Sequence, residues 1–239
     1  MAFIRSLIFS CIMILTTVFV STFGLLTLPF PFSFRWYFIR QWAVINLWVI
    51  EHICGIKYKL TGKENIPKQT AIIFSKHQST WETMALQQIF PPHVYVIKRE
   101  LLRIPFFGWG IRILNPIAID RSSGRAAVRQ VVDKGTERLR RGEWIVIFPE
   151  GTRVRPGEKK RYRLGGALLA AESGYPIVPV AHNAGEFWPK GAFIKKPGTI
   201  NVVIGPAIET KNKTPEDLIK EVENWIESTM QGITTHRSR

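Results

Sequence analysis

Residues 71–82 read AIIFSKHQSTWE, and within this stretch the sequence changes from a pattern typical of a β-strand to one compatible with a helix. Residues 71–74 form a short apolar run that contains two isoleucines, which is typical of a buried β-strand. A polar turn follows, and at Trp81 a helix-compatible run begins that extends to Ile89. A buried strand that leads through a polar turn into a helix is a building unit of α/β folds.

The same alternation of strands and helices continues from about Lys57 to the end of the chain. The candidate strands are rich in Val and Ile, are bounded by Gly, Pro or Asn, and lie at residues 57–60, 71–74, 94–98, 117–119, 144–148, 177–181 and 200–204. The candidate helices lie at residues 81–89, 125–140, 166–173 and 215–230. The last of them starts with Thr214 as N-cap and Pro215 in the first turn. We therefore expect an α/β layer fold without internal repeats.

An uncharged, apolar segment precedes this domain and runs from residue 6 to residue 28. Its length is close to what a helix needs to cross the hydrocarbon core of a bilayer, and Pro29 and Pro31 end it. The alternative is a cleaved signal peptide. However, the apolar run is longer than the usual signal-peptide core, and no Ala-x-Ala-like cleavage site follows. The segment therefore favours a retained membrane anchor.

A second segment, residues 35–56, is aromatic and apolar but also carries polar groups. These polar groups are Arg35, Arg40, Gln41, Asn46, Glu51 and His52. They disfavour a full membrane span, while the tryptophans Trp36, Trp42 and Trp48 suit the headgroup zone. We expect an amphipathic interfacial helix or the second leg of a re-entrant hairpin, with a buried core helix as the alternative. Residues 1–56 would then anchor the chain, and residues 57–239 would form its main domain.

The composition fits one basic domain with a short appendage. The 239 residues include 33 Lys and Arg against 18 Asp and Glu, a net charge of +15. Such an excess favours a polyanionic partner, whether nucleic acid, an anionic membrane surface or a phosphorylated substrate. The two cysteines, Cys11 and Cys54, provide neither a disulfide framework nor a zinc-binding cluster. We therefore expect no metal site and a domain that faces a reducing cytoplasm.

His77 and Glu82 are the first candidates for catalysis. On one regular helix their spacing would point the two side chains to different faces. If His77 lies in the turn, however, Glu82 in the first helical turn can reach its imidazole and hold one tautomer, leaving the other nitrogen to accept a proton. The alternative is a capping box, Ser79-x-x-Glu82, in which Glu82 only binds main-chain N–H groups. The stretch alone favours the two interpretations equally.

A second candidate patch, Phe-Pro-Glu-Gly-Thr-Arg at residues 148–153, follows directly after an apolar strand. Gly151 allows the main chain to approach a ligand closely, and Arg153 offers a fork of donors suited to phosphate. Thr152 adds a hydroxyl group, and Glu150 is placed to orient Arg153 or a substrate hydroxyl. An ordinary charged turn is the alternative. The residues that follow, up to 163, are dense in Arg and Lys and predict a basic loop.

Two further patches complete the set. The first begins with Lys98 and Arg99, passes through Pro-Phe-Phe-Gly at 105–108 and ends at Arg121. Cations beside an apolar turn suit a lipid headgroup next to its acyl chain, although they also suit a surface loop. The other patch is Ile-Val-Pro-Val at 177–180, where proline within a strand pattern marks an edge or a bulge.

These four patches, in this order, resemble the glycerolipid acyltransferase family, and most closely its bacterial lysophosphatidic acid acyltransferase branch. The family pattern is His-x4-Asp, then Lys-x-x-Leu with Pro-Phe-Phe-Gly, then Phe-Pro-Glu-Gly-Thr-Arg, then Val-Pro-Val. The likeness runs from about residue 60 to residue 205. It implies a mixed sheet flanked by helices, with an N-terminal membrane-associated helical segment and an acyltransferase domain at residues 57–239. One departure is Glu82, which stands where the family usually has Asp.

The resemblance also implies a reaction. His77, oriented by Glu82, would deprotonate the sn-2 hydroxyl of 1-acyl-glycerol-3-phosphate. That oxygen would attack the thioester of acyl-CoA or acyl-acyl carrier protein and give phosphatidic acid for phospholipid biosynthesis. No covalent enzyme intermediate, metal or prosthetic group would be needed, and the thioester would be a co-substrate.

The same resemblance assigns the substrate-binding residues and the partners. These residues are Lys98, Arg121, Glu150, Gly151, Thr152 and Arg153, with Arg153, Lys98 and Arg121 on the phosphate. Tyr162-Arg163-x-Gly165 is similar to an aromatic-Lys-x-Gly element that follows this turn in the family. Lysophosphatidic acid, an acyl-CoA or acyl carrier protein, and membrane lipids would be the partners. The expected location is the bacterial inner membrane, with the catalytic domain in the cytoplasm.

Two alternatives differ in what the basic surface binds. Another lysolipid could be the acceptor, but the cations in two patches favour a phosphorylated one. A membrane-tethered nucleic-acid-binding protein would also fit the net charge. Its signature motifs, such as a helix-turn-helix or a zinc finger, do not occur in the sequence, so no nucleic acid partner is expected.

Overall fold

The computed structural model describes residues 1–234 of the chain, except for the side chain of Arg121. The strands are β1 (Ile56–Thr61), β2 (Ile72–Ser75), β3 (His93–Lys98), β4 (Ile117–Ile119), β5 (Trp144–Ile147), β6 (Ile177–His182) and β7 (Gly198–Ile204). The helices are α1 (Ala2–Gly24), α2 (Phe32–Cys54), α3 (Trp81–Ile89), α4 (Phe107–Ile113), α5 (Arg125–Arg140), α6 (Gly165–Ser173) and α7 (Pro215–Ile233). Short 3₁₀ turns are η1 (Leu25–Thr27), η2 (Lys63–Asn65), η3 (Arg99–Arg103), η4 (Arg121–Ser123) and η5 (Ala184–Glu186).

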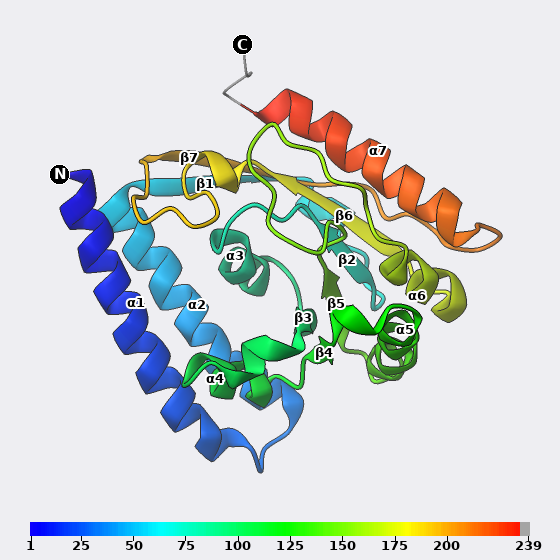
Figure 1. Cartoon of the computed structure of the whole chain (residues 1–239), viewed down its shortest axis with the longest axis horizontal. Coiled ribbons are helices and arrows are strands. Elements are labelled where there is room, and N and C mark those ends of the chain that lie inside the picture. Colours follow the sequence, from blue (N-terminus) through cyan, green and yellow to red (C-terminus); the bar gives the residue numbers. More distant parts are fainter. Residues whose placement is uncertain (235–239) are drawn as a thin grey trace.

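The seven strands form one mixed sheet with the order β1-β7-β6-β2-β5-β3-β4 (Figure 1). All neighbouring pairs are parallel except β6 and β7, which are antiparallel. The expected α/β fold with helices around a mixed sheet is thus confirmed. Every strand expected from the sequence is present, with bounds that differ by at most two residues. The differences arise because hydrogen bonds between strands, and not the length of the apolar run, define the ends of a strand.

Each face of the sheet has its own apolar core. Alternate side chains of a strand point to opposite faces, so Val146 of β5 packs on one side and Ile145 and Ile147 pack on the other. Helices α2 and α3 cover the first face. Helices α5, α6 and α7 cover the second face. The apolar strand runs found in the sequence are explained by this burial on both faces.

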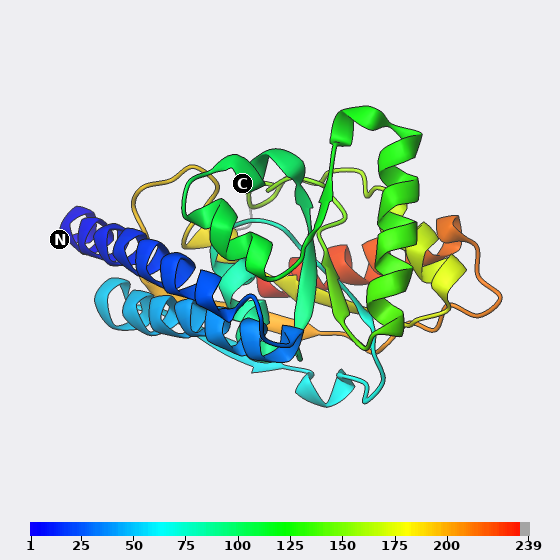
Figure 2. The same ribbon diagram turned by 90° about the horizontal axis from the view of Figure 1, so that it is seen from below.

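Helices α1 and α2 form a hairpin that lies beside the sheet (Figures 1 and 2). The inner side of α2, including Leu47 and Ile50, belongs to the first core. The expectation that three tryptophans face the headgroup zone is wrong for Trp36, which is buried and donates from Nε1 to the His93 carbonyl oxygen over 3.1 Å. Trp48 is 60% exposed and does point outward. Helix α2 therefore combines a buried core face with an outer aromatic face.

Helix α1 and η1 together form a segment, Ala2–Thr27, that is long and apolar enough to cross a membrane. Its outer side chains, such as Ile14, Leu15 and Phe19, are exposed, whereas Phe9 and Val20 on the inner side are buried. The helix thus lies against the rest of the molecule along its length and presents an apolar surface outward.

Helix α4 was not expected from the sequence, which predicts only a turn at the Pro-Phe-Phe-Gly motif. Its glycines are poor helix formers, but they allow close packing that a side chain would prevent. A Cβ atom at Gly110 would approach the Ser21 hydroxyl oxygen of α1 to 2.6 Å. Contact with α1 therefore stabilises a helix whose sequence has little helical preference.

Candidate active site

The two strongest motifs lie at the ends of neighbouring parallel strands. Strand β2 pairs with β5 in the register Phe74–Ile147, so the turns that follow the two strands start side by side. Such strand ends are where α/β sheets place their ligand sites. The ring of His77 stacks on Phe148 with centroids 3.9 Å apart and an interplanar angle of 16°. The fold thus brings together two patches that are far apart in sequence.

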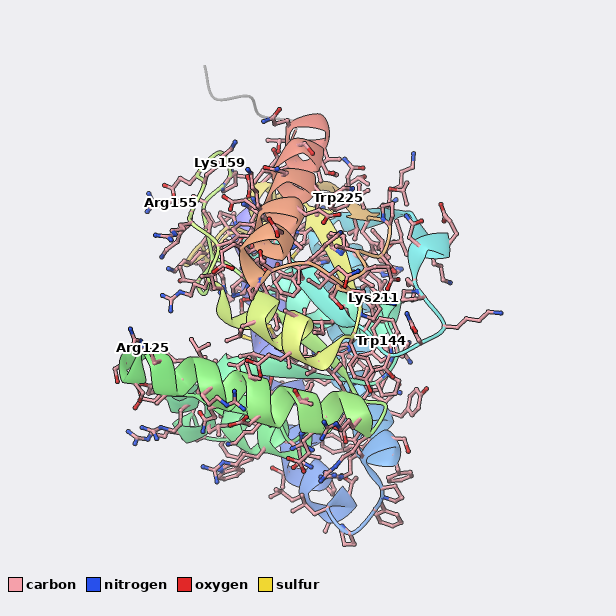
Figure 3. The ribbon with its side chains drawn as sticks, turned by 90° about the vertical axis from the view of Figure 1, so that its right-hand side faces the viewer. Arg125, Trp144, Arg155, Lys159, Lys211 and Trp225 are labelled. Carbon is pink, nitrogen blue, oxygen red and sulfur yellow. The ribbon has the colours of Figure 1, made fainter. Side chains whose placement is uncertain are left out.

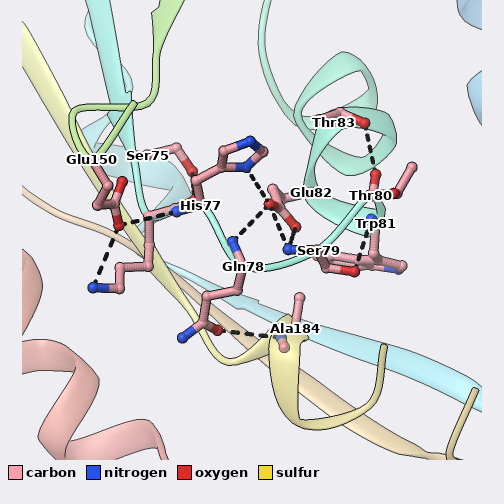
Figure 4. A network of polar contacts seen from close by, with 12 residues as sticks. Ser75, His77, Gln78, Ser79, Thr80, Trp81, Glu82, Thr83, Glu150 and Ala184 are labelled. Carbon is pink, nitrogen blue, oxygen red and sulfur yellow. Dashed lines mark hydrogen bonds and ion pairs between the residues drawn. The ribbon is translucent and has the colours of Figure 1, made fainter. Parts of the chain in front are cut away.

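His77 and Glu82 are in direct contact, as Figure 4 shows. Nδ1 of His77 lies 2.8 Å from Oε1 of Glu82, and the Glu82 side chain is almost fully buried. A carboxylate can only accept, so Nδ1 carries the proton and donates it in the hydrogen bond. That assignment leaves Nε2 of His77 as the basic nitrogen. A neutral imidazole held in this tautomer has the geometry of a general base.

Glu82 also caps the start of α3. Its carboxylate accepts from the Ser79 N–H at 2.8 and 3.0 Å and from the Gln78 N–H at 3.0 Å. The Ser79 hydroxyl accepts from the Trp81 N–H instead of completing the capping box at Glu82. Capping and contact with His77 are therefore not alternatives, because one carboxylate does both.

These contacts also affect the pKa of the Glu82 carboxyl group. Burial by itself raises the pKa of the Glu82 carboxyl, but His182, His77 and the Ser79 N–H oppose this effect and lower the pKa below its usual value. The carboxyl group is therefore ionised at neutral pH and can stabilise a positive charge on His77.

The main chain of His77 is held by Glu150 of the 148–153 turn and by Val154, which follows the turn. Its N–H donates to Oε1 of Glu150 over 3.3 Å, and its carbonyl oxygen accepts from the Val154 N–H over 2.8 Å. Glu150 is fully buried and also faces the Lys76 ammonium. The buried Glu150 side chain therefore holds the His77 loop by accepting a hydrogen bond from its main chain.

Gly151 has a left-handed main chain with φ of 69°, which glycine adopts without strain. A Cβ atom at this position would approach Nε of Arg163 to 2.7 Å. The demand for glycine in this turn therefore comes from its main-chain shape and from the Arg163 guanidinium that packs on it.

A cavity of about 510 Å³ opens at His77. Of the site residues expected from the sequence, His77, Lys98, Gly151 and Arg153 line it. Arg163 lines it as well, and the sequence pointed to this residue only through the Tyr-Arg-x-Gly element. Cationic side chains thus share a wall of the cavity with the basic nitrogen.

Most of the cavity wall is apolar. One part is formed by α1, α2 and α4, with Val20, Ile39, Trp42, Ile111 and Leu114 among its residues. Another part is formed by Ala127, Val128 and Val131 of α5. A cavity that joins cations to long apolar walls suits an amphiphilic ligand with an anionic head and a hydrocarbon chain.

The site residues expected from the sequence differ in their surroundings. Thr152 does not line it and accepts through its hydroxyl from Lys190 over 3.4 Å. Lys98 is 50% exposed and lies 3.5 Å from Glu100. Arg121 belongs by its main chain to η4, but its side chain lies outside the described part of the structure. Within residues 1–234, no group of three or more His, Cys, Asp or Glu side chains could hold a metal ion.

One neighbour of His77, the buried His182, has no counterpart in the sequence predictions. Nε2–H of His182 donates to the Lys76 carbonyl oxygen over 2.7 Å, while its Nδ1 accepts from the Ala184 N–H. Burial lowers the pKa of His182 although Glu82 opposes this effect, so its imidazole is neutral. No local sequence signal marks His182, because it reaches the site only through the pairing of β2 with β6.

Comparison with known proteins identifies the family. The model of the family described as Acyltransferase matches residues 57–183. A 1-acyl-sn-glycerol-3-phosphate acyltransferase of Pseudomonas aeruginosa is 45% identical over 213 residues, which cover 87% of this chain and 83% of that protein. One of Borreliella burgdorferi is 33% identical over 174 residues, covering 72% and 68% of the two chains.

The fold is shared with a solved structure. The crystal structure of the 1-acyl-sn-glycerophosphate (LPA) acyltransferase PlsC from Thermotoga maritima has a TM-score of 0.81 to this chain at 23% identity. The likeness covers 99% of this chain and 97% of that one. The chain belongs to the acyltransferase family that contains the 1-acyl-sn-glycerol-3-phosphate acyltransferases.

Proposed function

We propose that the protein transfers a fatty acyl group from a thioester to the sn-2 hydroxyl of 1-acyl-sn-glycerol-3-phosphate, forming phosphatidic acid. The observation that carries this proposal is the His77–Glu82 pair at a cavity that combines cations with apolar walls. The names of the relatives from Pseudomonas aeruginosa and Borreliella burgdorferi point to the same reaction.

In this proposal His77 is the general base. Its Nε2 takes the proton of the sn-2 hydroxyl as the oxygen attacks the thioester carbonyl carbon. The imidazolium that results is stabilised by the buried Glu82 carboxylate on the other ring nitrogen. When the tetrahedral intermediate collapses, the C–S bond breaks and the proton passes from Nε2 to the leaving thiolate. The enzyme ends the cycle unchanged.

The phosphate of the acceptor binds to the cationic part of the cavity. Arg153 and Arg163 line that part with Lys98, and guanidinium groups offer paired donors to phosphate oxygens. Glu150, Gly151 and Thr152 form the turn that places Arg153. The main chain of Arg121 lies between Ile119 and Gly124, which both line the cavity. The acyl chains lie along the apolar walls. A phosphorylated acceptor therefore fits better than a neutral or zwitterionic lysolipid.

The acyl donor is acyl-CoA or acyl-acyl carrier protein, and the reaction uses no resident metal or cofactor. Figure 3 shows Arg155 and Lys159 on the outer side of the loop that follows the 148–153 turn. These cations suit either the phosphates of coenzyme A or an acidic carrier protein. Nucleic acid is not a partner in this proposal.

The N-terminal hairpin attaches the enzyme to the membrane that holds its acceptor. Residues 1–56 form this anchor and residues 57–239 the acyltransferase domain, which faces the cytoplasm at the bacterial inner membrane. Helix α1 packs on the domain along its length while its outer side chains are exposed. We therefore favour an anchor that lies within one leaflet over a helix that crosses the bilayer away from the domain.

The proposal is tested by assaying the purified protein with radiolabelled acceptors against a panel of donors. The acceptors are lysophosphatidic acid, glycerol-3-phosphate, lysophosphatidylcholine and a lyso-ornithine lipid, each with acyl-CoA and with acyl-acyl carrier protein. We expect the highest kcat/KM for lysophosphatidic acid, with label appearing in phosphatidic acid. A higher kcat/KM for an acceptor that lacks a phosphomonoester would contradict the proposal.

A further inference from the structure

A buried charge cluster lies behind His77, on the side away from the cavity. Its centre is Lys76, whose side chain is 2% exposed. The Lys76 ammonium lies 2.5 Å from Oε1 of Glu227 on α7 and 3.4 Å from Oε1 of Glu150. Helix α7 is thereby connected to the 148–153 turn and to the residue that precedes His77.

The geometry of this cluster is asymmetric. Lys76 is close enough to Glu227 for a short charge-assisted hydrogen bond, whereas its distance to Glu150 is that of a weak contact. The hydroxyl of Tyr162 also donates to Oε1 of Glu227, over 3.0 Å. Glu227 therefore holds the ammonium group more closely than Glu150 does, and the ion pair of Lys76 with Glu150 is the longer of the two.

This asymmetry matters because Glu150 has a second donor to bind. Its Oε1 accepts from the His77 N–H over 3.3 Å, and its Oε2 has no hydrogen-bond partner among the described residues (Figure 4). An ammonium that moved towards Glu150 would compete with the His77 N–H for the same oxygen. The His77 main chain would then lose one of its two contacts with the turn.

We propose that Glu227 is a positioning residue for acyl transfer: it draws the Lys76 ammonium towards α7, so that Oε1 of Glu150 remains available to the main-chain N–H of His77. This inference rests on the proposed function, because it assigns to α7 a part in placing the base. Small displacements of a catalytic group lower the rate of reaction without removing substrate binding. The effect of Glu227 therefore belongs to kcat and not to KM.

The charge state of Glu150 supports the inference. Burial raises its pKa to about 7, although Lys76 and the His77 N–H act in the opposite direction. The groups that face this cluster are Lys76 and His77 from the β2 turn, Tyr162 from the basic loop, Glu223 and Glu227 from α7, and His182 from β6. The balance between Lys76 and the two carboxylates therefore decides whether Glu150 is ionised near neutral pH.

The test compares Glu227→Gln with Glu223→Gln on the same helix. Glutamine keeps the size of the side chain but loses the charge that attracts Lys76. Glu223 lies one turn earlier and is not among the hydrogen-bond or ion-pair partners of Lys76, so its substitution changes the local charge without releasing the ammonium. The measurements are kcat, KM for lysophosphatidic acid, the pH profile of kcat and the thermal midpoint.

For Glu227→Gln we expect kcat to fall about tenfold with unchanged KM, because His77 is displaced while the substrate site remains. The acid limb of the kcat profile should move to lower pH, because Lys76 then pairs with Glu150 and lowers its pKa. Lys76→Met should move that limb to higher pH, because Glu150 is left without its cation. Glu223→Gln should leave kcat and the acid limb as in the wild type.

Three results would overturn the inference. They are an unchanged kcat in Glu227→Gln, a loss of thermal stability alone, and an equal loss of kcat in Glu223→Gln. Since wild-type turnover of lysophosphatidic acid is measured in the same series, a failure of the proposed function would show as an inactive wild type. A failure of this inference would show as an active wild type and a Glu227→Gln variant with the same kcat.

Discussion

Glu82 fixes both the position of α3 and the tautomer of His77. Its two oxygens accept from two main-chain N–H groups and from Nδ1 of His77, so the helix start and the imidazole are tied to one carboxylate. The longer side chain of Glu, compared with the usual Asp of the family, reaches back from the first turn of α3 to the preceding loop. The start of α3 thereby fixes the orientation of the His77 imidazole.

A matched pair of variants separates the effect of the Glu82 charge on catalysis from the effect of capping on the stability of α3. Glu82→Gln removes the negative charge that stabilises the imidazolium, and we expect kcat to fall about a hundredfold. Ser79→Ala keeps that charge but removes the hydroxyl that accepts from the Trp81 N–H, and should lower the free energy of unfolding by about 1 kcal/mol. Steady-state kinetics and thermal denaturation measure both effects. If Glu82→Gln lost only stability, Glu82 would be a helix cap and nothing more.

Glu150 predicts a pH dependence of stability. Its pKa is about 7 in the folded chain and near 4.5 when exposed, so the folded state binds more protons between these values. The contribution of Glu150 to the free energy of unfolding must therefore fall as pH rises through this window, and it must level off above about pH 7. Glu150→Gln lacks this titration.

The difference in unfolding free energy between wild type and Glu150→Gln should thus become less favourable to the wild type from pH 5 to pH 8. Chemical denaturation in one detergent at both pH values measures it. Other groups, such as Glu82 with its lowered pKa, titrate in both proteins and cancel. A difference that grows with pH would mean that Glu150 is stabilised as a carboxylate.

The sequence offered the contact of His77 with Glu82 as one of two interpretations, because both residues belong to one strand–turn–helix unit, and the family resemblance favoured it. The sequence did not predict Lys76 with Glu227, which are 151 residues apart. That contact depends on where α7 packs, and nothing local to either residue encodes it. Charged residues on an amphipathic helix are usually solvated, so Glu227 carried no signal of its own.

Among the elements, the 148–153 turn does most to shape the site. It stacks Phe148 on His77, holds the His77 main chain and carries Arg153 to the cavity wall. These contacts follow from the parallel pairing of β2 with β5. The family likeness pointed to this turn, but only the sheet order shows that it surrounds the base.

Arg153 and Arg155 offer a matched test of the phosphate site. Arg153 lines the cavity, whereas Arg155 is exposed on the outside of the same loop. We expect Arg153→Ala to raise KM for lysophosphatidic acid about tenfold or more, because a charge-assisted contact to phosphate contributes about 1.5–3 kcal/mol. Arg155→Ala should leave KM for the acceptor unchanged. Equal effects of the two substitutions would remove Arg153 from the phosphate site.

Helix α4 could not be predicted from its sequence. Its glycine-rich sequence suggests a turn, and only its packing against α1 and α2 makes it helical. By contrast, α5 and α7 have clear amphipathic patterns, and α5 was predicted to the residue. Elements defined by their own periodicity are predictable, whereas elements defined by a partner are not.

At the scale of the whole molecule, Lys195 connects helix α1 with the loop before β7. Lys195, on the loop before β7, donates from its main-chain N–H to Ser6 and from its ammonium to Ser10 of α1. Its ammonium also lies about 5 Å from the rings of Phe9, Trp188 and Phe193. The N-terminal hairpin thus shares the apolar core with the sheet instead of being attached by a flexible linker.

Deletion of residues 1–30 should therefore not release a soluble enzyme. The inner side of α2 would lose the α1 side chains that cover it, among them the buried Phe9 and Val20. We expect the truncated protein to aggregate or to lose activity even in detergent, as measured by size-exclusion chromatography and acyl transfer. A monodisperse, active and detergent-free remainder would show that the hairpin is only an anchor.

The proposed role of His77 as the base that activates the acceptor hydroxyl can be tested directly. The most direct measurement is the rate of phosphatidic acid formation from radiolabelled lysophosphatidic acid by wild type and His77→Ala, purified in the same detergent and checked for equal membrane association and thermal midpoint. We expect kcat to fall by about a hundredfold or more in His77→Ala, while the protein stays folded and still binds its acceptor. A His77→Ala protein that forms phosphatidic acid at a rate near that of the wild type would contradict this role.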